Sequence, residues 1–347
     1  MSLKSLIRPI YRASNLRYRK VTLQIAKFIF SLNQTTSRLT LSYSAGVKSD
    51  GLGAQLQRVL ALNALGEYWR VPVRHAPIRQ IAVHPLDGFV DDNEYVDFLK
   101  SINELIDSSD STEISDSKVI YINDLQFRHI FLLAIKLFFS RRRYILKVTH
   151  PYFFIDAMPS LYSCKSNFAV RENLRLHITD GQKHKISLHH RQGVGNMAIQ
   201  PGQSHSREIA QTAYSEILRS LLNKHPEMLV HLFTDAPEFD FKFRPASEQK
   251  QSWQNLPAFD GEVMKISGNS LRSLIADLPR GSKVIRGGHP LQALANMASG
   301  SILVLSRSSF GYVAALLSEG SEIFIPEDFW HPPLPGWETY SINSGYQ

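Results

Sequence analysis

The chain has 347 residues, a formal net charge of +8 and a single cysteine, Cys164. This length favours two domains, and one cysteine excludes an internal disulfide and any multi-cysteine metal site. A hydrophobic content of 43% and a charged content of 20% are those of an ordinary soluble globular protein.

The excess positive charge lies entirely in the first part of the chain. Residues 1–150 contain 21 Lys and Arg against 13 Asp and Glu, a difference of +8, and no acidic residue precedes Asp50. This asymmetry indicates an anionic partner, either a membrane surface or an acidic substrate. Aromatic and basic residues are not interleaved in a recognisable binding motif, so we expect no nucleic-acid partner.

No stretch is long and apolar enough to span a bilayer, and the N-terminus lacks the apolar core and cleavage site of a signal peptide. We therefore expect a cytoplasmic protein. Residues 129–140 form an apolar run that is interrupted by Lys136 and followed by three arginines. Two interpretations of this run remain open: a basic amphipathic helix lying peripherally on a membrane face, or a core helix whose cationic end suits the helix dipole.

The N-terminal half predicts helices that alternate with short strands. We place the boundary between an N-terminal α/β domain and a C-terminal domain after residue 170, within a polar region. The expected elements are basic helices in 2–33, strands at 39–44, 70–83 and 118–123, and helices at 55–69 and 127–144.

The C-terminal domain, residues 171–347, reads as a βαβ series, which is typical of a parallel sheet with Rossmann-type connections. The expected strands are 186–189, 228–233, 283–286, 302–305 and 323–325, and the expected helices are 206–223, 271–277, 290–299 and 311–317. The fold class is therefore α/β with two domains.

Polar turns follow three of these strands, at His189–Gly195, Thr234–Pro237 and Ser306–Ser309. The carboxyl ends of neighbouring parallel strands meet at one sheet edge, so we expect these turns to converge there. Arg191 supplies a rigid fork of donors that fits a phosphate and stays charged in a cleft. The alternative for Arg191 is an ion pair with a carboxylate at a strand end.

The other two turns offer hydrogen-bonding groups beside that charge. Ser306, Ser308 and Ser309, with Phe310, precede a helix and can donate to phosphate oxygens. Asp235 can accept from a ribose or a base. The alternatives are a helix N-cap for each serine and a turn residue for Asp235.

A glycine-rich turn also precedes the predicted helix of residues 55–69. It reads Gly51-Leu52-Gly53-Ala54-Gln55, and the N-terminus of a helix accepts anions readily. A tight turn without a ligand explains the same two glycines, so this signal alone is weak.

Together these segments resemble the motifs of the fucosyltransferase superfamily, which includes bacterial α1,2- and α1,6-fucosyltransferases and protein O-fucosyltransferases. The glycine turn resembles the Gly-x-Gly-Asn-Gln of that superfamily. The motif His-x-Arg-x-Gly-Asp matches His189-His190-Arg191-Gln192-Gly193-Val194. A strand ending in Ser/Thr-Asp-Asp matches Phe233-Thr234-Asp235-Ala236-Pro237. The motif Ser-Asn-Ser-Ser/Thr-Phe-Ser-x-x-Ala-Ala matches Ser306-Arg307-Ser308-Ser309-Phe310-Gly311-Tyr312-Val313-Ala314-Ala315.

The resemblance implies a GT-B-like fold, with two Rossmann-type domains facing a cleft. It implies an inverting, metal-independent transfer of fucose from GDP-fucose to a glycan acceptor, with no cofactor besides the GDP-sugar donor. The C-terminal domain would hold the donor, and the basic N-terminal domain would face the acceptor. Arg191 would neutralise the departing diphosphate. The absence of any Asp-x-Asp sequence agrees with a reaction that needs no metal.

Three departures from the motifs leave the donor and the general base open. Gln192 replaces an Arg, Val194 an Asp and Ala54 an Asn. Alternatives are therefore another nucleotide sugar as donor, or a degenerate nucleotide- or glycan-binding module. The catalytic candidates are Arg191, His189 and His205, with His190 and Glu208 as further bases, and the nucleotide-binding candidates are Gly51, Gly53, Gln55, His189, Arg191, Gly193, Asp235, Ser306, Ser308, Ser309 and Phe310.

Overall fold

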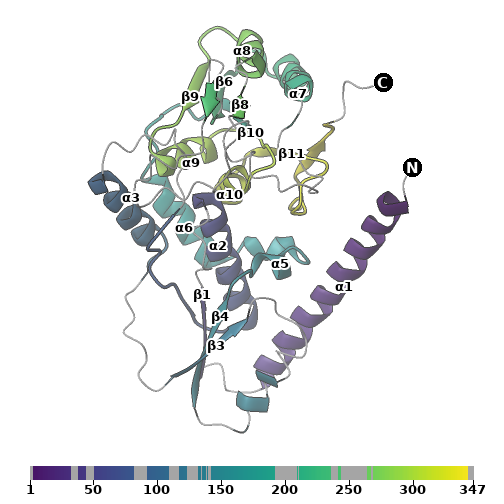
Figure 1. Cartoon of the computed structure of the whole chain (residues 1–347), viewed down its shortest axis with the longest axis vertical. Coiled ribbons are helices and arrows are strands. Elements are labelled where there is room, and N and C mark those ends of the chain that lie inside the picture. Colours follow the sequence, from purple (N-terminus) through teal and green to yellow (C-terminus); the bar gives the residue numbers. More distant parts are fainter. Residues whose placement is uncertain are drawn as a thin grey trace. The chain divides into compact units, whose positions relative to one another are not determined.

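The chain forms two compact units in this computed structural model (Figure 1). Unit 1 comprises Met1–Lys48, Gln55–Arg79 and Asn103–Val170, and unit 2 comprises Ser49–Ala54, Gln80–Ile102 and Arg171–Gln347. The structure describes residues 3–32, 38–43, 51–81, 92–108, 117–122, 132–133, 135–137, 139, 142–191, 209, 211–235, 241–243, 264–266 and 269–342.

Unit 1 is built on a four-stranded parallel sheet in the order β2-β1-β4-β3. The expected strand at 70–83 is reduced to a two-residue β2. The strands are β1 (Leu39–Tyr43), β2 (Val73–Arg74), β3 (Ser117–Ile122) and β4 (Arg143–Val148).

The predicted basic segment at residues 2–33 is one helix, α1 (Leu3–Leu32). Its inner face buries Leu23, Ala26 and Phe30. Trp69, the last residue of α2 (Leu52–Trp69), anchors this face: its ring centroid lies 5.4 Å from that of Phe30, and its indole N–H donates to the carbonyl of Leu23. Within the part of the chain that the structure describes, no helix is long and apolar enough to cross a bilayer.

Three shorter helices follow in chain order: α3 (Asp92–Leu105), α5 (Tyr152–Ile155) and α6 (Lys165–Arg175), with a 3₁₀ turn at Pro159–Tyr162 before α6. The last change of unit falls inside α6, between Val170 and Arg171. The acceptor and donor roles of the two domains, and the cleft between them, stay predictions.

Unit 2 contains a six-stranded parallel sheet in the order β12-β11-β10-β5-β6-β9, and a short antiparallel pair, β7-β8. Numbered along the chain, the six strands lie in the order 6-5-4-1-2-3, which is the Rossmann order and reverses between β5 and β10. They are β5 (Lys185–His190), β6 (Leu229–Thr234), β9 (Lys283–Arg286), β10 (Ile302–Val304), β11 (Glu322–Pro326) and β12 (Glu338–Tyr340), and the pair is β7 (Phe241–Phe243) and β8 (Met264–Ile266). The predicted α/β class with Rossmann-type domains is confirmed.

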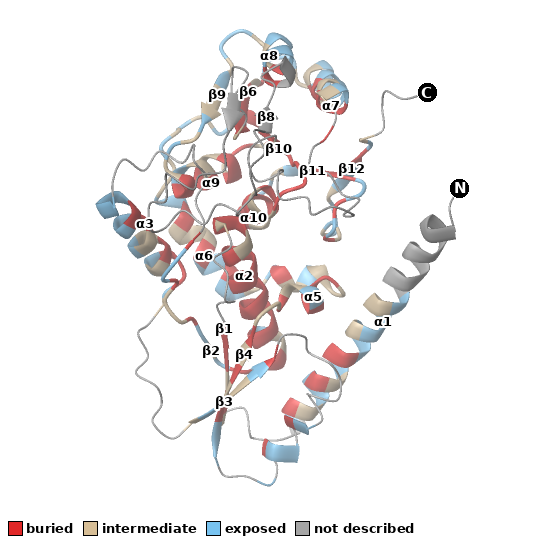
Figure 2. Cartoon of the chain, viewed as in Figure 1, coloured by how far each residue is buried: buried red, intermediate tan, exposed pale blue. Residues whose placement is uncertain are grey.

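The central strand β5 is buried along its whole length, as expected for a parallel strand covered on both faces. Figure 2 shows buried residues along the sheet and on the inner sides of the helices around it. The helices are α7 (Gln211–Lys224), α8 (Asn269–Ala276), α9 (Pro290–Ala298) and α10 (Ser309–Leu317). Leu188, Leu218 and Leu232 belong to one apolar cluster, and burying each such side chain stabilises the fold by roughly 1.5–3 kcal/mol.

A charged cluster closes the amino-terminal end of β5. Lys185 is fully buried, and its ammonium donates to Asp180 Oδ2 at 3.0 Å. His231 Nδ1 lies 2.8 Å from the same oxygen, and Lys283 Nζ lies 3.6 Å from Oδ1. Burial raises the pKa of Asp180, but the hydrogen bonds from Lys185 and the Gln182 amide, together with the charges of Lys185 and His231, outweigh it, so the pKa is below its ordinary value.

Replacing Asp180 with Asn should therefore destabilise unit 2. The buried ammonium of Lys185 would lose its counter-charge, which costs about 3–5 kcal/mol in comparable sites. Lys283→Met removes a cation whose side chain is 56% exposed, so it should cost at most about 1 kcal/mol. Urea denaturation of both variants measures the difference, and equal stabilities would contradict this role for Asp180.

Candidate functional site

The described residues of three polar turns of unit 2 meet at the carboxyl edge of its sheet. Parallel pairing places β5 between β10 and β6, so residues that follow these strands are neighbours. Arg191 follows β5, Asp235 follows β6, and the Ser306–Ser309 turn follows β10. The predicted convergence of the turns is therefore present, at the point where the strand order reverses and where open α/β sheets bind ligands.

The guanidinium of Arg191 contacts both neighbouring turns. Its Nη1 donates to Ser308 Oγ at 3.0 Å, and its Nε lies 3.8 Å from Asp235 Oδ2. The Arg191 side chain is 12% exposed. The alternative of an ion pair with a carboxylate at a strand end is therefore present, with Asp235 as the partner. The side chain still reaches the surface, so it does not sit sealed in the core.

The serines of the third turn have different partners. Ser308 is the N-cap of α10, with its Oγ accepting from the Phe310 amide at 3.2 Å. The capping alternative therefore holds for Ser308, together with the contact to Arg191. Ser306 is fully buried and lies 2.8 Å from His189 Nδ1, whereas Ser309 is the partly exposed first residue of α10.

Both histidines at the end of β5 are packed. His189 Nδ1 faces Ser306, and His190 Nδ1 lies 2.9 Å from Thr234 Oγ1, with its ring 5.3 Å from that of Tyr214. Burial, and then the charge of Arg191, lowers the pKa of His189 to about 3; burial lowers the pKa of His190 to about 4. Such weakly basic imidazoles are poor general bases near neutrality, so the geometry favours a packing role for His189.

The glycine turn predicted before residue 55 lies mostly inside α2, which begins at Leu52, and Gly53 packs on the start of α10. Gly53 belongs to unit 2, and a Cβ built on it would lie 2.3 Å from the Phe310 amide nitrogen. The backbone at the start of α2 is thus packed directly on the start of α10, which only glycine permits. This packing explains Gly53 without a ligand.

Gln55 has a structural partner in unit 1. Its side chain is buried, and its Oε1 accepts from the hydroxyl of Tyr43, which also accepts from Arg58 Nη1 at 3.1 Å. Gly193 and His205 lie outside the described residues, as do Gln192, Val194 and Glu208. Their proposed roles stay predictions.

Gly311, which the sequence motifs alone do not single out, also shapes this edge of the sheet. A Cβ on Gly311 would lie 2.8 Å from His189 Nδ1, so its absence lets α10 approach the end of β5. A glycine in the first turns of a helix is a local signal of close packing, but its partner 122 residues earlier is known only from the fold.

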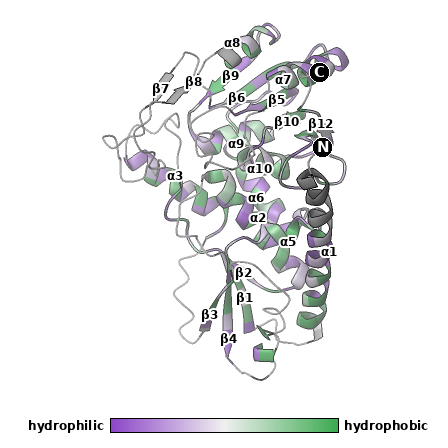
Figure 3. Cartoon of the chain, turned by 45° about the vertical axis from the view of Figure 1, so that its right-hand side comes forward, coloured by the Kyte–Doolittle hydropathy of each residue, from purple (hydrophilic) through white to green (hydrophobic). Residues whose placement is uncertain are grey.

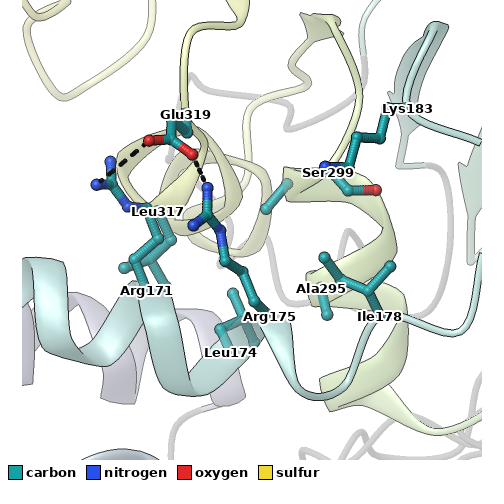
Figure 4. A pocket seen from close by; sticks show the side chains of 10 residues that line it. Arg171, Leu174, Arg175, Ile178, Lys183, Ala295, Ser299, Leu317 and Glu319 are labelled. Atoms are coloured by element: carbon teal, nitrogen blue, oxygen red, sulfur yellow. Dashed lines mark ion pairs between the residues drawn. The ribbon is translucent and has the colours of Figure 1, made fainter. Parts of the chain in front are cut away.

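Unit 2 also has a cavity of about 310 Å³ at the amino-terminal edge of the sheet, between the ends of α6, α9 and α10 (Figure 4). Its basic side chains include Arg171, Arg175 and Lys183. Both arginines form ion pairs with Glu319 (Figure 4). Arg191 also has a carboxylate nearby, that of Asp235, so ion pairing does not distinguish the two edges. The edge that carries Arg191 is the better candidate because it lies where the strand order reverses. Among the described residues, no group of three His, Cys, Asp or Glu could hold a metal ion.

Gly53→Ala should distort the start of α10. The added methyl group would meet the backbone of Phe310, which cannot rotate away, and we expect a loss of about 1–3 kcal/mol. Gly181→Ala is the matched control, because nothing lies within 4 Å of the position that its methyl group would take. Thermal unfolding compares the two; an unchanged melting temperature for Gly53→Ala would contradict the close packing.

The free energy of unfolding should fall as the pH drops below about 6.5. At that pH the histidines of the unfolded chain bind protons, whereas the buried His189 and His190 of the folded chain have pKa values of about 3 and 4 and stay neutral. His190→Gln should reduce the loss between about pH 7 and pH 5 by up to about 2 kcal/mol. The exposed His184→Gln is the control. Denaturation at both pH values tests this, and an unaltered pH dependence in His190→Gln would overturn it.

No protein-family model matches the chain, and no curated relative matches its sequence. Solved structures with a similar fold include a family 9 glycosyl transferase from Veillonella parvula DSM 2008, with 9% identity, a TM-score of 0.40, and coverage of 89% of this chain and 88% of that one. The ADP-heptose LPS heptosyltransferase II of E. coli gives 11% identity, a TM-score of 0.35, and coverage of 88% and 90%. E. coli heptosyltransferase WaaC, with ADP-2-deoxy-2-fluoro heptose, gives 11% identity, a TM-score of 0.40, and coverage of 87% of this chain and 92% of that one.

Proposed function

We propose that unit 2 binds the diphosphate of a nucleotide sugar at Arg191 and that the protein is an inverting, metal-independent glycosyltransferase. The observation that carries this proposal is the contact of Arg191 with the turns after β6 and β10, at the point where the strand order reverses.

The chemistry of this edge suits a diphosphate. A guanidinium binds two phosphate oxygens at once and keeps its charge when partly buried. The helix α10 begins at Ser309, beside the same guanidinium, and adds the positive end of a helix dipole. Asp235 supplies an acceptor for a ribose hydroxyl or a base amine.

In the proposed reaction an acceptor hydroxyl oxygen attacks the anomeric carbon of the sugar. The bond from that carbon to the phosphate oxygen breaks, and the nucleoside diphosphate leaves with the electron pair. Arg191 and the α10 N-terminus stabilise the negative charge that develops on this leaving group. The hydroxyl proton passes to a general base; because the pKa of His189 is low, His205 is the better candidate of these two histidines.

The finer assignment is fucose as the sugar, GDP-fucose as the donor and a glycan as the acceptor, bound in the cytoplasm. It rests on the resemblance to fucosyltransferase motifs in the segments around Arg191, Asp235 and Ser308. Two alternatives follow from Gln192 and Val194, where the motif has an Arg and an Asp: another nucleotide sugar as donor, or a nucleotide- or glycan-binding module that does not turn over.

Arg191→Ala should weaken the binding of GDP by about 10- to 150-fold, the loss expected for one charge-assisted hydrogen-bonding group. Arg191→Lys should restore part of it, because an ammonium keeps the charge but not the two-point geometry. Arg175→Ala, at the cavity on the other sheet edge, is the control and should bind GDP as the native protein does. Isothermal titration calorimetry measures all three variants.

Release of free nucleotide from a panel of GDP-, ADP- and UDP-sugars, with glycan acceptors, then separates the donors. Turnover of GDP-fucose alone supports the finer assignment, and turnover of a different donor replaces it. Binding of GDP without turnover of any donor favours the binding module. If no nucleotide diphosphate binds at millimolar concentration, the proposed site is wrong.

A further inference from the structure

The outer face of α1 combines exposed apolar side chains with exposed cations. Tyr18, Val21 and Phe28 are 51%, 52% and 62% exposed, although the opposite face of the helix is packed in unit 1. Val21 and Phe28 are two helical turns apart and form one stripe; Lys20 and Lys27, with the same spacing, lie next to it. Figure 3 shows this mixture of hydrophobic and hydrophilic residues along the helix.

A second segment of unit 1 has the same character. The helical residues of the segment 132–139 bury Leu133 and Leu137 but expose Leu132, Ile135 and Phe139, the last by 81%. The buried face agrees with the core-helix interpretation, and the membrane-surface interpretation of the exposed face stays a prediction. Arg38 Nη2 donates to the carbonyl of Leu137 at 3.0 Å, which ties the segment to the chain that follows α1 (Figure 1).

The charge on these elements has one sign. The 30 residues of α1 include seven Lys and Arg and no Asp or Glu, and the described part of the segment 132–139 adds Lys136 without an acid. Single exposed apolar side chains are common on proteins, but several on one element rimmed by charged residues mark an interaction surface. The surface therefore calls for a partner that is both anionic and apolar.

We propose that this face, formed by the exposed side chains of α1 and of the segment 132–139, docks on an anionic lipid bilayer. Phosphate headgroups satisfy Arg17, Lys20 and Lys27, while Phe28 and Phe139 enter the boundary between headgroups and acyl chains, as in interfacial amphipathic helices. A second copy of the chain would bring two cationic faces together, which electrostatic repulsion disfavours. The inference concerns binding alone and does not depend on the proposed reaction.

The test is flotation of the full chain with vesicles of phosphatidylcholine, with or without about 30% phosphatidylglycerol, at low and high salt. We expect binding to the anionic vesicles only, and weaker binding at high salt. Arg17→Glu with Lys20→Glu should lower the partition coefficient about 30-fold or more, since each cation near the surface contributes about 1 kcal/mol.

The matched control is Arg219→Glu with Arg280→Glu, two exposed arginines of unit 2 that undergo the same change of charge. It should bind within about twofold of the native chain if the effect belongs to this face and not to net charge. Phe28→Ser with Phe139→Ser should also weaken binding, although every cation remains. Circular dichroism spectra should be native-like in each variant, because all the substituted side chains are exposed.

Four results would overturn the proposal. The first is equal binding to neutral vesicles, or none to anionic ones. The second is an equal loss in the control variant. The third is that Phe28→Ser with Phe139→Ser leaves vesicle binding unchanged but abolishes a dimer seen by analytical ultracentrifugation, since a second copy would then cover the face. Tight binding to duplex DNA that ignores the Phe substitutions, with weak binding to vesicles, would likewise replace the bilayer by a nucleic acid.

Discussion

The hydrogen bond from Arg191 to Ser308 joins residues 117 positions apart, and it exists because β5 and β10 are neighbours at the reversal of strand order. This contact requires the start of α10 to pack closely on the end of β5 and on the start of α2. Gly311 lets α10 come within reach of His189, and Gly53 lets the start of α2 pack on the start of α10. The guanidinium is held by the side chains of Ser308 and Asp235, whose positions follow from this packing. A phosphate would therefore meet a donor that is already in place, which reduces the ordering cost of binding.

The two edges of the same sheet handle charge in opposite ways. At the amino-terminal edge Asp180 compensates Lys185, and Glu319 pairs with the arginines of the cavity, so these charges stabilise the fold and leave little for a ligand. At the carboxyl edge the packed imidazoles stay neutral, with pKa values of about 3 and 4. A negative ligand there meets a guanidinium that has no protonated imidazole beside it, and its competitor is the carboxylate of Asp235, 3.8 Å from Arg191 Nε.

The apolar runs predicted strands at 186–189, 228–233, 283–286, 302–305 and 323–325, and each corresponds to a strand of unit 2, because buried parallel strands read as continuous apolar segments. The three-residue β7, β8 and β12 contain no continuous apolar run, unlike the equally short β10, so the sequence does not predict them. The strand predicted at 70–83 has only two paired residues. Local sequence also identified the Arg191 turn. It could not distinguish Gly53 as a packing residue from a phosphate-binding one, since its partner Phe310 is 257 residues away.

The charge distribution separates two kinds of anion recognition. Residues 151–347 contain 18 Lys and Arg and 18 Asp and Glu, so the part of the chain that carries Arg191 has no net positive field to attract an anion. Selectivity at Arg191 must therefore come from short-range geometry, in a partly buried position where salt screens weakly. The exposed cations of α1 depend instead on the summed field of an acid-free segment, which salt screens strongly. The chain would thus recognise a diphosphate by short-range geometry and a bilayer by long-range charge. Raising the ionic strength would therefore weaken bilayer binding far more than diphosphate binding.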